Sequence, residues 1–539
     1  MQSLSGSHYT SKLSFNSTSL KKMKIFVRAS FFLLIPCFVV AFYNLSLPLL
    51  FFIISLLSLS PFFANVWLVP GGFAWRKPYL NPSKIPGPIG WPFLGILPEM
   101  GAHAHRKLAS MAISMGATRL MIFSLGTVRV VITSHPETAK EILCGSAFSD
   151  RPVKESASLL MFERAIGFAP SGKYWRHLRK IVAQHMFSPK RVLSLECLRH
   201  RVCEEMMAKV LADMSEKKVV ELRGIFQKGS LINVIESVFG SGLGYEKEEE
   251  LGFMVKQGYE LIGEFQWGDY FPIRVLDFTG VKRRCQKLTL KVKSLVGQIV
   301  EERRRDGGGI NNGRNDFLSV LLSLAKDDQL TDADMVAVLW EMIFRGVDTV
   351  AILLEWIMAR MVLHQDIQAK AQEEIEEHVG NHRPVQDSDI PNLVYVQAIV
   401  KEVLRLHPPG PLLSWARLAT HDVQLGKFFV PAGTTAMVNM WAITHDPSIW
   451  KNPLDFNPER FMEEDFPIMG SDLRLAPFGS GRRVCPGKSL GLATTHLWLA
   501  RLLQQYKWLP IPSTKVDLSE CLKLSLELQT PLTCRALVR

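Results

Sequence analysis

The chain has 539 residues, of which 47% are hydrophobic, and its formal net charge is +12 at pH 7. This length and composition exclude a disordered or low-complexity protein and suffice for a large hydrophobic core. The positive charge suits nucleic acid, an anionic membrane surface or an acidic protein partner. Because no basic run alternates with aromatic residues as in nucleic-acid-binding motifs, we expect no nucleic acid partner. The eight cysteines show neither C-x-x-C nor zinc spacing, which indicates reduced thiols.

The N-terminal region divides into a basic, Ser-rich tail (residues 1–28) and a stretch of 47 uncharged residues (29–75). As one helix that stretch would be roughly 70 Å long, whereas the bilayer hydrocarbon is about 30 Å thick. We therefore predict a membrane anchor at 29–75, formed either by one span or by a hairpin of two short spans. Basic residues on both sides leave the topology open. The acid-free, Ser-rich start also fits an organelle transit peptide.

The segment that follows the anchor, residues 76–98, is rich in proline and glycine. Proline fixes the backbone and donates no hydrogen bond, so this segment predicts a stiff, non-helical hinge. No second linker of comparable strength follows. Residues 99–539 are therefore expected to form one globular domain.

A long helix is predicted over residues 331–363. Thr331 with Asp334 three residues later resembles a capping box, and an apolar stripe at helical spacing follows. The predicted helix has about 30 residues, enough to cross a large domain at 1.5 Å per residue.

The middle of this helix contains the sequence GVDT (346–349). A glycine inside a helix lowers stability by about 1 kcal/mol relative to alanine, so Gly346 calls for a structural or functional explanation. One interpretation is a notch in which Asp348 and Thr349 bind a small molecule and transfer protons. The other is a glycine at a close helix crossing, with the threonine bonded back to its own helix.

A second helix is predicted within residues 391–411, where Glu402 and Arg405 are three residues apart and flanked by apolar residues. A buried pair of this kind needs further partners, because breaking a buried ion pair costs about 3–5 kcal/mol. Arg460 is our candidate, since a guanidinium can bridge a carboxylate and backbone carbonyls at once.

A basic helix is predicted within residues 171–187, with Trp175 and Arg179 one turn apart. The two side chains donate hydrogen bonds and accept none, so together they suit the carboxylates of a planar ligand. The alternative is an ordinary amphipathic surface helix.

The sequence FGSGRRVCPG (478–487) places one cysteine among glycines and arginines. Glycines permit a tight loop around a bulky group, and a neighbouring arginine favours the thiolate, which binds metals. Cys485 is therefore a candidate axial metal ligand. The alternative is a turn with an incidental buried thiol.

Together these four segments resemble a cytochrome P450 over roughly residues 80–539. The loop matches every fixed position of the pattern F-x-x-G-x-R-x-C-x-G, at Phe478, Gly481, Arg483, Cys485 and Gly487. The resemblance implies a mainly α fold, with a helical bundle around haem b, small β-sheets and a preceding membrane anchor.

The resemblance also implies a role for each candidate residue. The Cys485 thiolate is the axial iron ligand, and Phe478 packs near its sulfur. The residues expected to hold the haem propionates are Arg483, Trp175, Arg179 and Arg417.

On the other side of the haem, Asp348 and Thr349 would deliver protons for dioxygen activation, and Gly346 would give the oxygen room. Glu402, Arg405 and Arg460 would form a structural triad. Two positions depart from the family pattern: Arg345 replaces a small residue, and Val350 stands where a second hydroxyl is common.

The implied function is a membrane-bound monooxygenase of the endoplasmic reticulum, with its catalytic domain on the cytosolic face. It would hydroxylate a lipophilic small molecule, with electrons from NADPH delivered through a flavin-containing P450 reductase. Several segments, including AFSDRPVKESA and PGGFAWRK, resemble the plant 78A-type subfamily linked to organ and seed size. That resemblance suggests a fatty acid or a derived growth signal as substrate. The alternatives are an isomerase or dehydratase that works without a reductase, or a non-catalytic haem-binding protein.

Segments expected to line the substrate pocket are 157–168, 411–415 and 525–531, together with Met342 and Phe344. A largely apolar pocket favours a lipophilic substrate without selecting among fatty acids, terpenoids and steroids.

Overall fold

The computed structural model describes residues 69–76, 85–271, 277, 279–307, 316–413, 416–512 and 514–539. The predicted tail (1–28) and most of the predicted anchor lie outside these residues, as do residues 77–84 of the predicted hinge. Within the described part of the chain, no helix is long and apolar enough to cross a membrane.

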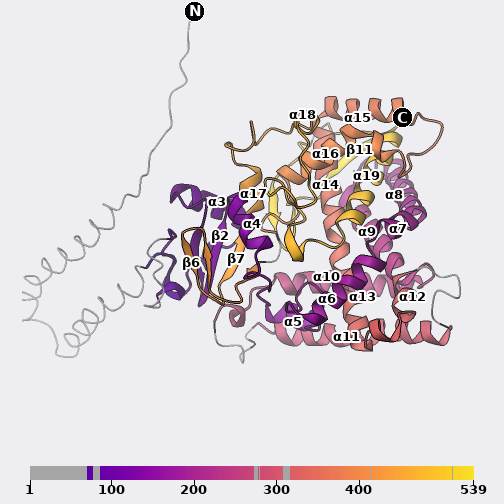
Figure 1. Cartoon of the computed structure of the whole chain (residues 1–539). Coiled ribbons are helices and arrows are strands. Elements are labelled where there is room, and N and C mark those ends of the chain that lie inside the picture. The colour runs from indigo at the N-terminus through magenta and orange to yellow at the C-terminus, as the bar shows by residue number, and fades with distance from the viewer. Residues whose placement is uncertain are drawn as a thin grey trace, which may run out of the picture.

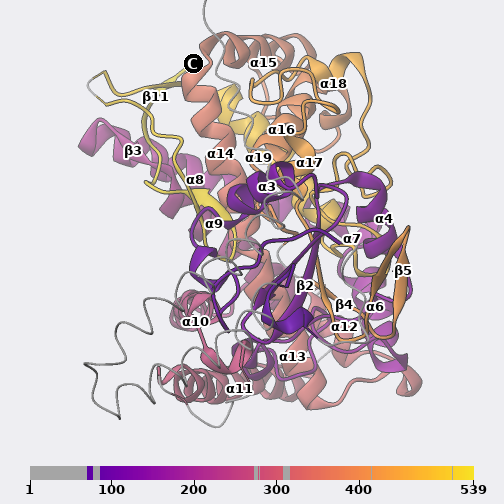
Figure 2. The same ribbon diagram turned by 90° about the vertical axis from the view of Figure 1, so that its left-hand side faces the viewer.

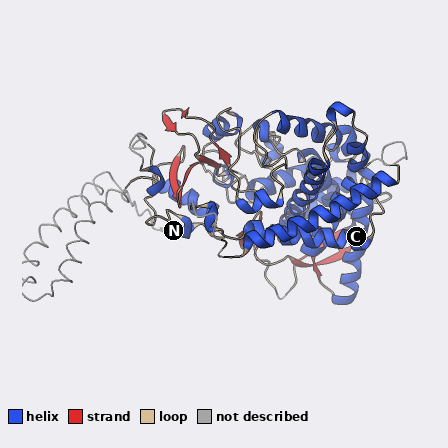
Figure 3. Cartoon of the chain, turned by 90° about the horizontal axis from the view of Figure 1, so that it is seen from below, coloured by secondary structure: helices blue, strands red, loops and turns tan. Residues whose placement is uncertain are grey.

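Helices make up most of the described structure (Figure 3). The longer helices are α3 (Ala104–Ser114), α4 (Pro136–Cys144), α6 (Lys173–His185), α8 (Glu196–Lys217), α9 (Leu222–Phe239), α10 (Tyr245–Gly263), α11 (Val281–Arg305), α13 (Asp332–Gly346), α14 (Asp348–Leu363), α15 (Gln365–His378), α16 (Val394–Leu406) and α19 (Lys488–Gln505). The shorter α-helices are α5 (Glu155–Leu160), α7 (Pro189–Ser194), α12 (Phe317–Leu322), α17 (Met440–Thr444) and α18 (Arg460–Glu463).

The strands form four small sheets. The largest has the order β1 (Met121–Leu125), β2 (Val128–Thr133), β7 (Thr435–Val438) and β4 (Arg417–Leu418). The second has the order β3 (Val220–Glu221), β11 (Thr533–Val538) and β8 (Tyr506–Leu509). The two-stranded sheets pair β9 (Glu520–Leu522) with β10 (Leu526–Leu528) and β5 (Val423–Leu425) with β6 (Phe428–Val430).

The largest sheet joins segments that are far apart in the sequence. Strand β2 pairs in parallel with β7, in a register that places Val130 opposite Thr435. Figures 1 and 2 show this sheet at one side of the molecule, with the helices α8, α9 and α19 beyond it. An isolated bridge between Asp150 and Leu418 extends the same edge and brings the segment after α4 beside β4.

The predicted long helix is present as two helices, α13 and α14, separated at Val347. The predicted cap is confirmed, because the Thr331 hydroxyl accepts a hydrogen bond from the backbone N–H of Asp334 at 3.2 Å. Both helices are buried along most of their length, and α14 contacts α9, α16 and α19. This pair therefore forms the centre of the helical region (Figure 1).

The described residues at the end of the predicted anchor and in the predicted hinge pack on the globular domain. Trp75, expected to end the anchor, is 1% exposed, and its Nε1–H donates a hydrogen bond to the carbonyl of Phe123 at 2.9 Å. In the predicted hinge, the carbonyl of Pro86 accepts from the N–H of Ile122 at 3.0 Å. Residues 69–76 and 85–98 thus pack on β1, because their apolar side chains and free carbonyls complete that edge of the sheet.

Candidate functional site

The cysteine loop packs tightly against α4. The backbone N–H of Cys485 donates to the carbonyl of Phe478 at 3.0 Å, which closes the loop just before α19. Gly481 has φ +69°, and a Cβ there would lie 2.2 Å from the carbonyl oxygen of Leu143 at the end of α4. Only glycine permits this approach. The tight loop predicted from the sequence is therefore confirmed, and Cys485 is partly exposed on it.

Arg417 on β4 has guanidinium nitrogens that no protein group satisfies. Its Nη2 donates to the carbonyl of Ser480 in the cysteine loop at 3.2 Å, whereas Nε and Nη1 are buried without a hydrogen-bond partner. Burial, together with the nearby guanidinium of Arg483, lowers the pKa of Arg417 to about 10. Buried donors of this kind are costly unless a ligand accepts their hydrogen bonds.

Arg179 on α6 is a second guanidinium close to Cys485. Its Cζ lies 5.9 Å from the centre of the Trp175 ring. Burial lowers the pKa of Arg179, and the largest opposing effect comes from Cys485. Arg179 on α6 and Arg417 on β4 thus come from different elements.

Trp175 and Arg483 act on the protein backbone, which corrects the predicted role of Trp175. The only N–H of the Trp175 ring donates to the carbonyl of Ile166 at 3.0 Å, so it is not available to a propionate. Arg483 donates from Nη1 to the same carbonyl at 3.2 Å and from Nη2 to the carbonyl of Ala169 at 2.7 Å. Its Cζ lies 4.4 Å from the centre of the Trp175 ring. Both side chains therefore position the loop at residues 161–172.

Two further arginines join this group, and neither was predicted as a site residue. Arg151 is partly buried, and desolvation together with the guanidiniums of Arg417, Arg345 and Arg483 holds its pKa well below the usual range. Arg345 pairs with Glu341 one turn earlier on α13, at 3.3 Å. We call Arg151, Arg179, Arg345, Arg417 and Arg483 the arginine cluster.

The predicted triad is present, with every contact in place. Arg405 donates from Nε and Nη2 to the two oxygens of Glu402, both at 2.8 Å, and neither side chain is exposed. Arg460 Nε lies 3.1 Å from Glu402. Arg405 Nη1 also donates to the carbonyls of Thr444 and Pro453, at 2.9 and 2.7 Å. The triad therefore fastens α16 to residues 444–460.

The structure supports the packing alternative for Gly346. A Cβ at this position would lie 2.8 Å from Cγ2 of Val234 on α9, so the glycine permits two helices to cross closely. The expectation that Gly346 also gives oxygen room stays a prediction. Asp348 and Thr349 follow at the start of α14, and the Thr349 side chain is exposed.

A cavity of about 1730 Å³ lies beside this helix start. Val347 and Asp348 line it, together with apolar residues of α9, α10 and the sheet edge. Of the predicted wall segments, 411–415 and 525–531 contribute residues, whereas 157–168 does not. Met342 and Phe344 are buried in the core and are not among the residues that line this cavity.

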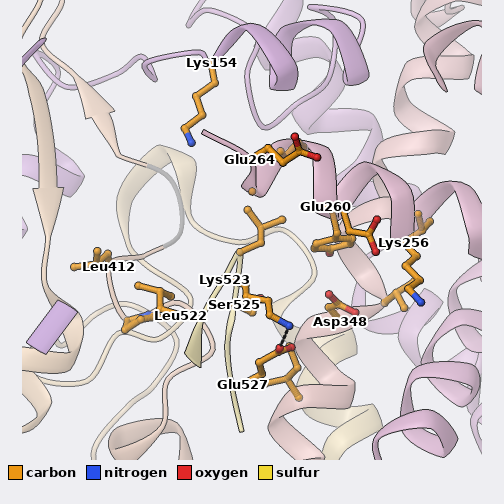
Figure 4. A pocket seen from close by; sticks show the side chains of 18 of the residues that line it. Lys154, Lys256, Glu260, Glu264, Asp348, Leu412, Leu522, Lys523, Ser525 and Glu527 are labelled. Carbon is orange, nitrogen blue, oxygen red and sulfur yellow. Dashed lines mark ion pairs between the residues drawn. The ribbon is translucent and has the colours of Figure 1, made fainter. Parts of the chain in front are cut away.

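Charged residues stand out on the cavity wall in Figure 4. Lys523 and Glu527 form an ion pair beside Asp348, and Lys154 enters from across the cavity. Burial, together with the charge of Glu527, raises the pKa of Asp348 to about 6, against the opposing effect of Lys523. A carboxyl with this pKa exchanges protons near neutral pH.

Comparisons with known proteins agree with this geometry. The family profile "Cytochrome P450" matches residues 85–534. Cytochrome P450 78A5 from Arabidopsis thaliana is 53% identical over 88% of this chain and 92% of its own length. The chain belongs to the cytochrome P450 family. A ferruginol synthase from Isodon rubescens is 35% identical over 78% of this chain and 88% of its own length.

A solved structure supports the same fold for this cytochrome P450. A zebra fish cytochrome P450 with progesterone has a TM-score of 0.70 and 25% sequence identity, over 81% of this chain and 99% of its own. The chain is therefore a P450 monooxygenase, and membership of this family implies haem with a cysteine thiolate ligand.

The residues present fit that cofactor. Haem carries two propionates, and the arginine cluster offers more cationic groups than the acids beside it, Asp150 and Glu341, can neutralise. The unsatisfied nitrogens of Arg417 suit a carboxylate, since guanidinium and carboxylate match in geometry. The cysteine loop places a soft sulfur ligand beside these donors, as a haem-thiolate site requires.

Proposed function

We propose that this P450 holds haem b through the Cys485 thiolate and hydroxylates a lipophilic small molecule. It uses dioxygen and electrons that pass from NADPH through a flavin-containing P450 reductase. The observation that carries the proposal is the pair of buried, unsatisfied nitrogens on Arg417 beside the cysteine loop. If no ligand bound at this place, these nitrogens would stay buried without hydrogen bonds, at a large cost in folding free energy.

In this proposal, each residue on the cysteine-loop side of the haem has a defined role. Arg417 and Arg179 bind the propionates, and Phe478 packs near the sulfur. Arg483 holds the loop that Trp175 also holds, and it neutralises a propionate through its charge. Haem with a thiolate ligand supplies the oxidising chemistry when it is bound, because the thiolate favours O–O cleavage.

On the α14 side, Asp348 and Thr349 move the protons that the reaction consumes. The Asp348 carboxyl lines the cavity and has a pKa of about 6, so it can take up a proton and release it. The exposed Thr349 hydroxyl directly follows it in the chain and can pass the proton onward. This intact acid and alcohol pair favours a monooxygenase over an isomerase or dehydratase that needs no proton delivery.

The proposed substrate is a lipophilic molecule that enters the cavity beside α10 and the β9–β10 hairpin. Leu231, Ile235, Val255 and Leu412 are among its apolar lining residues. By resemblance to the 78A-type relatives, the proposed class is a fatty acid or a derived growth signal that controls plant organ or seed size.

We further propose that the protein is anchored in the endoplasmic reticulum membrane, with the P450 domain on the cytosolic face. The stretch of uncharged residues from residue 29 supports this proposal, because it is long enough to cross the bilayer. Membrane lipid and the reductase are then the expected partners. Removal of residues 2–68 should release the protein from membranes washed with alkaline carbonate, and retention would contradict the anchor.

The experiment that tests the proposed function uses the full chain in membranes with an added P450 reductase. NADPH and ¹⁸O₂ are supplied with a panel of fatty acids, terpenoids and steroids, and products are detected by mass spectrometry. The proposal predicts a product that carries one ¹⁸O atom and requires the reductase. A product formed without reductase would favour an isomerase or dehydratase, and haem-loaded protein without any product would favour a non-catalytic haem protein.

A further inference from the structure

Arg345 is the departure from the family pattern that the proposed function does not explain. It lies in the last turn of α13, directly before Gly346, and 32% of its side chain is exposed. Its Nη1 lies 3.3 Å from Oε1 of Glu341. The Glu341 carboxylate also accepts the backbone N–H groups of Ile166 and Gly167, at 2.5 and 2.7 Å.

The guanidinium of Arg345 rests directly on the backbone of the 161–172 loop. A Cβ at Gly167 would lie 2.0 Å from Nη1 of Arg345, so a larger residue there would displace this guanidinium. On the cysteine-loop side, the carbonyl of Ile166 accepts hydrogen bonds from Trp175 and Arg483. The residues Ile166 and Gly167 therefore bridge Arg345 on α13 to Arg483 at the cysteine loop.

Arg151 links Arg345 to the remaining cluster. Arg151 follows Asp150, whose carbonyl accepts the N–H of Leu418, the residue after Arg417, at 2.8 Å. Desolvation lowers the pKa of Arg151, and the guanidiniums of Arg417, Arg345 and Arg483 lower it further. Like charges gathered at one site are stabilised by an opposite charge, such as an anion with more than one negative group.

We propose that Arg345, in the last turn of α13, stabilises the acidic edge of the haem from that side of the site. This inference rests on the proposed haem-thiolate function. Arg345 is a positioning residue with two effects. Its charge slows the loss of haem, and it raises the reduction potential, because a nearby cation favours the more negative, reduced form of the cofactor.

The Glu341 carboxylate has the opposite electrostatic effect, and this permits a sharp test. Arg345→Met removes a positive charge, and Glu341→Gln removes the negative charge that offsets it. If Arg345 only braced the loop, both variants would disturb the same loop in the same way. If its charge acts on the haem, the two variants shift the potential in opposite directions.

The test uses the purified full chain with haem, in detergent, and measures two properties other than turnover. The first is the rate of haem transfer to apomyoglobin, and the second is the midpoint potential in a dithionite titration. We expect Arg345→Met to lose haem several-fold faster and to shift the potential negative, with Arg345→Lys intermediate. We expect Glu341→Gln to shift the potential positive. Arg119→Met, which breaks an exposed pair with Glu137, is the matched control and should change neither property.

The proposal is overturned if Arg345→Met has the potential and haem loss of the parent, or if Glu341→Gln shifts the potential in the same direction. Should Arg345→Met fail to accumulate, Arg345→Lys and Glu341→Gln still decide, since a negative or absent shift in Glu341→Gln contradicts the charge effect. A parent protein without haem-thiolate absorption would instead overturn the proposed function itself.

Discussion

The triad and the arginine cluster of this P450 differ in whether their arginines find hydrogen-bond partners within the protein. In the triad, Arg405 uses its guanidinium on the Glu402 carboxylate and on backbone carbonyls, so its charge is matched within the protein. In the arginine cluster, Arg417 leaves two buried nitrogens without a partner. The arginine of the triad thus finds its partners within the protein, whereas in the proposed function haem supplies the missing partner of the cluster.

The difference shows how the two kinds of buried charge can be told apart. Arg405 reaches its acid on the same helix and its carbonyls on residues 444–455, so it fixes tertiary structure. The cluster gathers guanidiniums from five separate segments, where they repel one another and lower the pKa of Arg151. An arrangement that costs the folded protein stability is typical of a binding site.

The largest effect is expected from Arg405→Met. This change leaves the buried Glu402 carboxylate with Arg460 and the backbone N–H of Asn457 as partners, and breaking a buried ion pair costs about 3–5 kcal/mol. We expect no folded, haem-loaded protein, with the chain recovered in aggregates or degraded. Yield and haem content of detergent-extracted membranes measure this. Normal yield with bound haem would show that the triad is not a structural requirement.

The same substitution at Arg417 should give a different result. Arg417→Met removes buried donors that have no protein partner, so the haem-free protein should be at least as stable to heat as the parent. Haem content should fall several-fold, because a propionate loses its guanidinium. Thermal unfolding before and after haem loading gives both values. A large loss of stability in the haem-free protein would show that Arg417 has a structural role like that of the triad.

A smaller change is expected on the α14 side of the site. Thr349→Ala should leave folding and haem content unchanged but lower the product formed per NADPH several-fold, with the difference released as hydrogen peroxide. The hydroxyl passes protons, and without it reduced oxygen is lost before hydroxylation. Thr349→Ser is the matched control and should retain most of the coupling. Equal coupling in the alanine variant would contradict the proton-delivery role.

The smallest expected effect concerns the pH dependence of coupling. Burial and Glu527 raise the pKa of Asp348 to about 6, so its protonated fraction, and with it coupled turnover, falls as pH rises through this value. Glu527→Gln removes the negative charge and should move that fall to lower pH. Lys523→Met removes an opposing positive charge and should move it to higher pH. Profiles of product per NADPH from pH 5 to 8 test this, and unchanged profiles would exclude the effect of the ion pair on Asp348.

Much of the site could be predicted because its signals lie in short stretches of sequence. The signals are the helix cap at Thr331, the spacing of Glu402 and Arg405, and the glycines around Cys485. The same holds for the helices, whose apolar stripes are long enough to detect.

The remaining features depend on contacts between distant segments. The place of Arg151 follows from the bridge between Asp150 and Leu418, which no local pattern signals. The ring N–H of Trp175 donates to the carbonyl of Ile166. Ile166 lies in a loop that Glu341 holds by accepting the backbone N–H of the same residue. Strands as short as β4, with two residues, are too brief to show alternation of apolar and polar residues.

The central claim is that Cys485 binds haem iron as a thiolate inside a cluster of arginines. The carbon monoxide difference spectrum of reduced membranes that carry the full chain tests it most directly, beside Cys485→Ser membranes. We predict the Soret band that is characteristic of a carbon monoxide complex of thiolate-ligated haem in the parent, and its loss in the serine variant. Folded, haem-loaded parent protein without that band would contradict the thiolate assignment and the monooxygenase function that depends on it.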